Sequence, residues 1–151
     1  MLGTLHVPST SSGKTTWSSL LRTTDDMVAF SKARGTCFVS TTIQVPIHPL
    51  DDFSLEGPCV LKIDAEGSEL EVLKGATAVL GRCQLLLIEL SVFHRWQGEG
   101  RFAEIVSLLH ARGFELFDIP LLWYTLRNRD LTLIDAVFVP MADRRAGRWI
   151  E

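Results

Sequence analysis

Two stretches of the chain are apolar at nearly every position. One covers residues 60–63 and stops at Asp64, and the other covers residues 85–88 and stops at Glu89. Strands that are apolar on both faces are typical of parallel sheets covered by helices. A helical spacing of leucines lies between the two runs, so residues 60–89 predict a right-handed βαβ unit.

The predicted helix of this unit has its own start and stop signals. Ser68 and Glu71 stand three residues apart, which is the spacing of a capping box at a helix N-terminus. Gly75 predicts an early end. Its apolar positions are Leu70, Leu73 and Leu80.

The remaining elements follow from the period of the apolar positions and from Pro and Gly. They are a strand over 2–7 ended by Pro8, a weak helix over 17–30, a strand over 38–47, a helix over 101–111, and strands over 114–119 and 131–139 joined by a loop. We expect strands 60–64 and 85–89 to be adjacent, with the last two strands paired antiparallel beside them.

Composition limits the classes of protein to consider. The 151 residues are 46% apolar and carry a formal net charge of −3, which gives no general attraction to nucleic acid or to an anionic membrane. The sequence has neither a membrane-length apolar run nor a signal peptide, so we expect a cytoplasmic protein. Its three cysteines are widely spaced without a CxxC pair, which argues against a disulfide framework and a zinc site.

A partial nucleotide-binding motif lies near the N-terminus. The run from Pro8 to Thr15 ends in Gly13-Lys14-Thr15, like a P-loop, but Pro8 stands where the pattern has its first glycine. Proline has a fixed φ and no N–H to offer a phosphate. A Ser/Thr-rich surface loop is the favoured interpretation, and a degenerate P-loop is the weaker one.

The acids after the first apolar run are the best candidates for chemistry. Asp64 and Glu66 follow the carboxyl end of a predicted strand, where ligands bind in open α/β sheets. Gly67 allows a tight turn and close approach of a ligand. Acids also favour helix N-termini for electrostatic reasons alone, and the residues by themselves leave both interpretations open.

Longer motifs resemble a known family. Lys62 to Gly75 is similar to the signature K-[IV]-D-[VI]-E-G-x-E-x-x-V-L-x-G of FkbM methyltransferases, with Ala65 as the one departure. Leu50-Asp51-Asp52 resembles the T-L-D-D element of that family, with Pro49 in place of Thr. The resemblance covers roughly residues 40–140.

The resemblance implies an α/β fold: a partial class I methyltransferase (Rossmann-like) sheet, mostly parallel, with a C-terminal antiparallel strand pair. The N-terminal strands, with the Gly-rich turn for the cofactor, are expected to be missing, because no strand–Gly-x-Gly–helix pattern precedes Leu50. We expect a loop-rich segment over 1–37, the C-terminal half of the methyltransferase core over 38–140 and a tail over 141–151.

The implied activity is transfer of a methyl group from S-adenosyl-L-methionine to a hydroxyl oxygen of a small molecule. Asp64, Glu66 and Glu89 are the predicted catalytic residues, and Asp64, Glu66 and Gly67 the predicted cofactor-binding residues. The neighbouring ends of the two strands would bring Asp64 and Glu89 to one mouth. His94 is better explained as a solvated loop residue, and no metal site is predicted.

A non-catalytic protein is the alternative. A sheet without its first strands would expose an apolar edge and face, which favours self-association. The chain would then be an inactive remnant or an interaction module that lacks cofactor binding.

Overall fold

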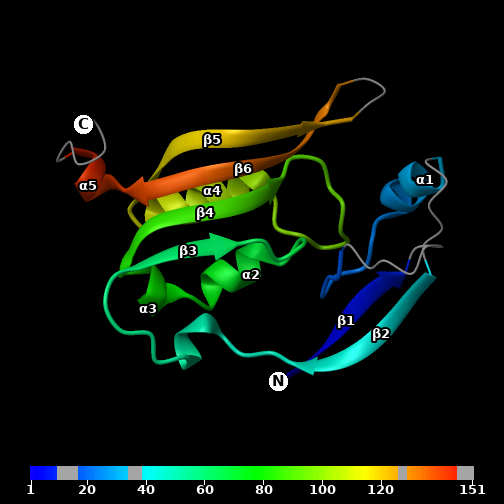
Figure 1. The fold of residues 1–151 in the computed structure, drawn as a ribbon, viewed down its shortest axis with the longest axis horizontal. Coiled ribbons are helices and arrows are strands. Elements are labelled where there is room, and N and C mark those ends of the chain that lie inside the picture. The colour runs from blue at the N-terminus through cyan, green and yellow to red at the C-terminus, as the bar shows by residue number, and fades with distance from the viewer. Residues whose placement is uncertain (10–16, 34–38, 126–128, 146–151) are drawn as a thin grey trace.

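The computed structural model describes residues 1–9, 17–33, 39–125 and 129–145, and it forms two separate sheets (Figure 1). The small sheet pairs β1 (Leu2–Ser9) with β2 (Val39–Pro46). The large sheet contains β3 (Cys59–Ile63), β4 (Cys83–Ser91), β5 (Phe114–Tyr124) and β6 (Leu131–Pro140). The helices are α1 (Asp25–Ala33), the 3₁₀ turn η1 (Leu50–Asp52), α2 (Glu69–Lys74), α3 (Thr77–Leu80), α4 (Phe102–Ala111) and α5 (Met141–Arg145).

The large sheet has the strand order β3-β4-β6-β5. The predicted neighbours β3 and β4 are parallel, and β5 and β6 are antiparallel, as expected. Three of its four strands, β3, β4 and β5, run in the same direction, which agrees with the expected mostly parallel sheet, and β6 runs antiparallel to its neighbours β4 and β5. The sheet is therefore mixed, within an α/β fold.

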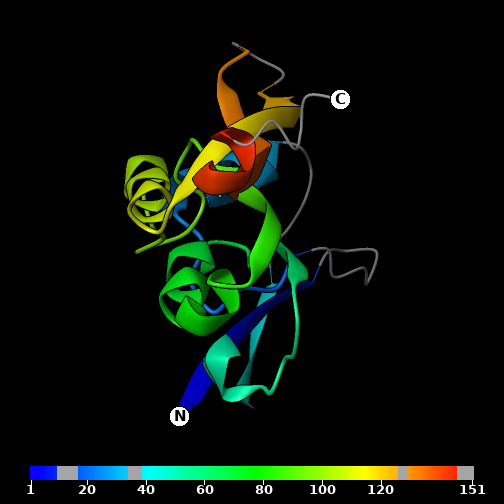
Figure 2. The same cartoon turned by 90° about the vertical axis from the view of Figure 1, so that its left-hand side faces the viewer.

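One face of this sheet carries the hydrophobic core. Helices α2, α3 and α4 lie on that face (Figures 1 and 2). Fully buried side chains from the strands meet fully buried side chains from the helices there: Leu86, Ile88, Leu90, Ala136, Leu73 and Leu109. The core therefore lies between this face of the sheet and the three helices.

The opposite face is less covered than the apolar runs predicted. Leu85 and Leu87 alternate with the buried residues of β4 and are only half-buried, and Val60 of β3 is 69% exposed. Burial on both faces of these strands was the expectation, and it is wrong for this face. Among the described residues, no helix is both long and apolar enough to span a membrane.

The strand β5 extends further than predicted. It continues through Pro120 to Tyr124, where the sequence indicated a loop. Pro120 is tolerated because β5 is an edge strand and the β5–β6 register shifts between Asp118 and Leu121. The outer half of β5 therefore still pairs with β6 despite the proline.

The predicted helix over 17–30 starts later than expected. Residues 17–24 are not helical, and they form backbone bridges from Ser19 to His6 and from Thr23 to Trp96. The helix α1 begins at Asp25, where the Thr24 hydroxyl accepts the Met27 N–H at 3.3 Å. A capping threonine followed by acids marks the true start. The partial P-loop over 8–15 lies mostly outside the described residues.

The Leu50-Asp51-Asp52 element has a structural role. The Asp51 carboxylate accepts the backbone N–H groups of Ala78 at 2.9 Å and Val79 at 3.0 Å. These bonds lower the pKa of Asp51 and cap α3, whose own N-cap residue makes no side-chain bond. The predicted helix that carries Leu70, Leu73 and Leu80 is two helices in the structure, and α2 ends at Gly75 as expected.

Candidate functional site

Three acids gather at the carboxyl ends of the parallel strands. The β3–β4 register ends with Ile63 beside Ile88, so Asp64 and Glu89 follow next to each other. Carboxylate oxygens of Asp64, Glu66 and Glu89 all lie within 4.8 Å of one another. The structure therefore brings together all three acids that were predicted as catalytic, and places them at the edge where α/β sheets bind ligands.

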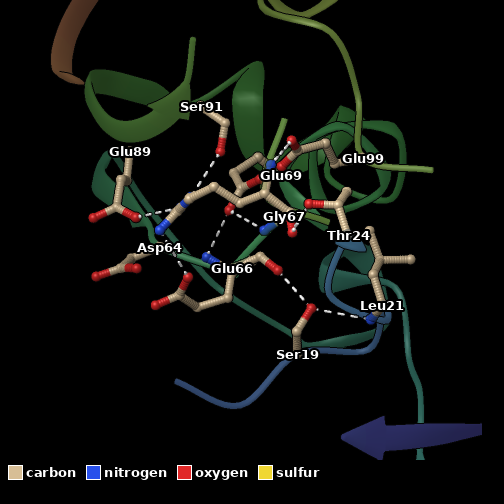
Figure 3. Close-up of polar contacts among 12 residues, drawn as sticks. Ser19, Leu21, Thr24, Asp64, Glu66, Gly67, Glu69, Glu89, Ser91 and Glu99 are labelled. Carbon is tan, nitrogen blue, oxygen red and sulfur yellow. Dashed lines mark hydrogen bonds and ion pairs between the residues drawn. The ribbon is translucent and has the colours of Figure 1, made fainter. Parts of the chain in front are cut away.

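The loop from β3 to α2 holds Glu66 in an unusual conformation. Glu66 has φ 46°, a left-handed value that is uncommon for residues other than glycine. Its carbonyl oxygen accepts the Ser19 hydroxyl at 2.5 Å. The buried Glu69 carboxylate accepts the N–H groups of Ala65 and Gly67, both at 3.0 Å. The turn is thus fixed on both sides of Glu66 (Figure 3).

The predicted capping box is wrong, and Glu69 explains why. Ser68 precedes α2 but its side chain makes no capping hydrogen bond, and the Glu71 carboxylate pairs with Lys74 instead. The Glu69 side chain bonds the loop N–H groups that precede the helix. The acid three residues after Glu66 in the signature is therefore a structural residue of the loop.

Gly67 leaves room for an aromatic side chain. A Cβ atom at Gly67 would lie 2.5 Å from Cδ1 of Trp96, closer than any real contact, and the residue has φ 98°. Trp96 is only 3% exposed. The absence of a side chain at Gly67 therefore allows the β3–α2 loop to pack against the loop between β4 and α4.

Arg95, from that second loop, connects two of the acids. Its Nη1 lies 3.3 Å from Oε2 of Glu66, and its Nη2 lies 3.0 Å from Oε1 of Glu89. The Arg95 Nε also donates to the Ser91 hydroxyl at 3.2 Å. The Arg95 side chain is 14% exposed, so these are largely buried contacts.

Asp64 is held differently. Its carboxylate is 38% exposed and pairs with Lys62 at 2.8 Å. Figure 3 shows Asp64 beside Glu66 and Glu89, on the side away from Ser19. Of the three acids, Asp64 is the one most open to solvent, since the side chains of Glu66 and Glu89 are 18% and 17% exposed.

Burial disfavours charge on the two covered acids. It raises the pKa of Glu66 to about 7, although the Arg95 guanidinium opposes the shift. Burial likewise raises the pKa of Glu89, again against Arg95, and nearby Asp64 raises it further. The Oε2 of Glu66 has no hydrogen-bond partner, so its contact with Arg95 is purely an ion pair. Both acids therefore hold a proton more readily than an exposed carboxyl group does.

Arg95 and Glu69 were both missed from the sequence. No spacing rule connects an arginine in a loop to acids six and 29 positions earlier. His94, for which the sequence favoured a solvated loop position, is exposed. The spacing of the three acids could accommodate a cation, but Arg95 already supplies positive charge to two of them, and we propose no metal site.

The fold is mixed α/β with a cluster of acids at the carboxyl ends of β3 and β4, and comparison with known proteins identifies the family. The profile of the methyltransferase FkbM domain matches residues 4–116, which is more than half of the chain. The chain therefore belongs to the FkbM methyltransferase domain family. The match begins well before residue 40, where the motif resemblance began, and so includes β1, α1 and β2. No curated protein and no solved structure matched the chain.

Proposed function

We propose that this chain carries part of the active site of an S-adenosyl-L-methionine-dependent methyltransferase that acts on a hydroxyl group of a small molecule. Family membership supports the class of reaction. The observation that carries the site assignment is the convergence of Asp64, Glu66 and Glu89 within 4.8 Å at the ends of β3 and β4.

The residues fit the cofactor in part. An exposed carboxylate at Asp64 suits the positive sulfonium group and hydroxyl groups, which are the chemical features of the cofactor that acids bind. The cofactor also has a carboxylate, which needs N–H donors or a cation. Three donors beside the acids are engaged: Glu69 takes the N–H groups of Ala65 and Gly67, and Arg95 binds two acids.

The proposed division of labour follows from this fit. When bound, S-adenosylmethionine supplies an electrophilic methyl group: its S–CH₃ bond breaks as the O–CH₃ bond of the product forms. Asp64 binds the acceptor hydroxyl and takes its proton. Glu66 and Glu89 lie beside Asp64 as the covered acids of the site, and Gly67 allows the turn that places Glu66. Catalysis otherwise requires mainly positioning of the two reactants.

We propose a cytoplasmic location for this protein.

We also propose that the chain has a Rossmann-like class I fold that lacks the Gly-rich first turn, and the partial fit to the cofactor agrees with this. A chain with only the acidic edge lacks several hydrogen bonds to the cofactor, each worth about 1 kcal/mol net and more when charged. We therefore expect the 151 residues alone to bind the cofactor orders of magnitude more weakly than the micromolar range.

Calorimetric titration with S-adenosylmethionine tests the proposal. The chain should bind weakly, and a supplied segment with a strand and Gly-rich turn should restore affinity. In the restored form, Asp64→Asn should lower turnover, measured as S-adenosylhomocysteine release with a panel of hydroxyl acceptors, far more than it lowers cofactor affinity. Micromolar binding by the monomeric chain alone would overturn the incomplete-site proposal, and failure of restored binding would overturn the methyltransferase assignment.

The non-catalytic alternative has one structural observation in its favour. From Leu116 onward, the large apolar side chains of β5 are between 37% and 54% exposed, which suits an interaction module. The same titration separates the two functions, because an interaction module has no reason to regain cofactor affinity when the Gly-rich segment is added.

A further inference from the structure

Arg95 is fixed in place by contacts from several parts of the chain. Its backbone N–H donates to the Glu99 carboxylate at 2.6 Å, and its backbone carbonyl accepts the Thr24 N–H at 3.0 Å. The neighbouring Trp96 is buried against Gly67. The backbone of Arg95 is therefore held at its N–H and at its carbonyl group. The side chain is oriented by these contacts without a bound ligand.

The Arg95 guanidinium pairs with two of the three acids and not with the third. It contacts Glu66 at 3.3 Å and Glu89 at 3.0 Å, whereas Asp64 pairs with Lys62, outside the buried cluster. A planar guanidinium can bind two carboxylates at fixed angles, which an ammonium group cannot do. Two covered acids and one exposed acid thus differ in their partner as well as in their burial.

We propose that Arg95 is the positioning residue of this site: it anchors Glu66 and Glu89 as a pair and leaves Asp64 as the acid that meets an incoming ligand. The role of Asp64 rests on the proposed function, whereas the anchoring of the pair does not. Arg95 acts through the two acids and not on the reacting atoms.

Charges around the pair explain why an anchor is needed. Glu66 faces Arg95, Glu89, Asp64 and Glu69, and Glu89 faces Arg95, Asp64 and Asp135, with Lys62 further out. Arg95 is the opposing cation that both acids share. Without it, desolvation and mutual repulsion would favour protonation of both, and the pair would lose its common partner.

A carboxyl-carbon NMR titration of the ¹³C-labelled chain tests the anchor directly. Arg95→Gln should move the titration midpoints of Glu66 and Glu89 upward by about one pH unit or more, as loss of an adjacent opposite charge does. Arg95→Lys, which keeps the charge and loses the fork, should lie between wild type and Arg95→Gln. Arg112→Gln is the control, because it removes an exposed guanidinium that bonds Thr77 and leaves the site intact.

Amide spectra establish that each variant is folded. Midpoints that stay in place in Arg95→Gln would overturn the proposal, since a guanidinium that only filled space would leave them there. If Arg95→Gln does not fold, Arg95→Lys decides the matter: unchanged midpoints would refute the fork, and raised midpoints would support it.

Adding S-adenosylmethionine at millimolar concentration tests the role of Asp64. In the wild type, the Asp64 carboxyl signal should move more than those of Glu66 and Glu89, and in Arg95→Gln all three should move. S-adenosylhomocysteine, which lacks the sulfonium charge, should have less effect. An equal response of the three acids in the wild type would refute the division. The same addition is made to the form restored with a strand and Gly-rich turn, and no response there would count against the proposed function, while the titration midpoints would still decide whether Arg95 anchors the pair.

Discussion

The strands β4 and β5 are both rich in apolar residues, yet the apolar side chains of β4 are largely buried and those of β5 are largely exposed. In β4, Leu86, Ile88 and Leu90 are fully buried beneath the helices. In β5, every large apolar residue after Phe114 is at least 37% exposed. β4 is flanked by β3 and β6, and β5 lies at the edge of the sheet. Apolar composition therefore identifies a strand, whereas its neighbours decide how much of it is covered.

The comparison predicts its largest effect for core truncations. Leu86→Ala should lower the free energy of unfolding by about 2–5 kcal/mol, because a fully buried leucine leaves a cavity. Leu122→Ala in β5, where the side chain is 45% exposed, should cost only about 1 kcal/mol. Denaturant titration measures both. Equal losses would show that β5 is covered in solution.

The two loops at the site allow a comparison of a covered glycine, Gly67, with an uncovered one, Gly98. Gly67→Ala must displace Trp96, and Gly98→Ala meets nothing within 4 Å, although both residues have a positive φ. Both changes should cost about 1–2 kcal/mol of backbone strain. Gly67→Ala should lose about 1–3 kcal/mol more through overpacking, measured by thermal or denaturant unfolding. Similar stabilities of the two variants would contradict the tight contact with Trp96.

The covered acid Glu66 should make stability depend on pH. Because its folded pKa is raised from 4.5 to about 7, the folded protein keeps a proton that the unfolded chain has released between these values. Stability from this group is therefore present at low pH and declines as pH rises from about 5 to about 7, by about 1–2 kcal/mol after allowance for partial exposure. Unfolding of wild type and Glu66→Gln at pH 5 and 8 checks this. The difference between them should shift in favour of Glu66→Gln at the higher pH, and a shift of opposite sign would refute the burial of Glu66.

The smallest effect on stability should come from the uncovered strand. Trp123 is 54% exposed, so Trp123→Lys should lower the free energy of unfolding by about 0.5–1 kcal/mol, because the lysine stem keeps part of the apolar contact. The same variant should weaken any self-association through the β5 edge, because charged side chains protect edge strands. Sedimentation at several concentrations measures this. Unaltered association would direct attention to another surface.

Sequence reasoning succeeded where signals were local and consistent. The apolar runs ending at Asp64 and Glu89, with a helix between them, predicted the β3–α2–β4 unit and the meeting of those two acids. It failed where a neighbouring side chain took a role that the spacing rule does not include. Ser68 has the right spacing for a cap, but the Glu69 side chain bonds the loop instead.

Other features depended on contacts that no local pattern encodes. The non-helical path of residues 17–24 is set by backbone bonds to His6, Arg95 and Gln97. Leu87 lies in a continuous apolar run, yet its face of the sheet is only half covered. Arg95 became visible as part of the site only when its distances to Glu66 and Glu89 were known.

The left-handed backbone of Glu66 has a consequence for selection experiments. At φ 46°, glycine and asparagine are the residues that fold most easily, and any other side chain carries a conformational penalty of about 1–2 kcal/mol. If every amino acid were encoded at position 66 and the library were sorted for folding alone, glycine and asparagine should therefore outcompete the native residue. If the library were sorted instead for methyl transfer by the complete enzyme, glutamate should return. The difference between the two rankings would measure how much the Glu66 carboxylate contributes to methyl transfer, compared with the stability that its left-handed backbone conformation costs.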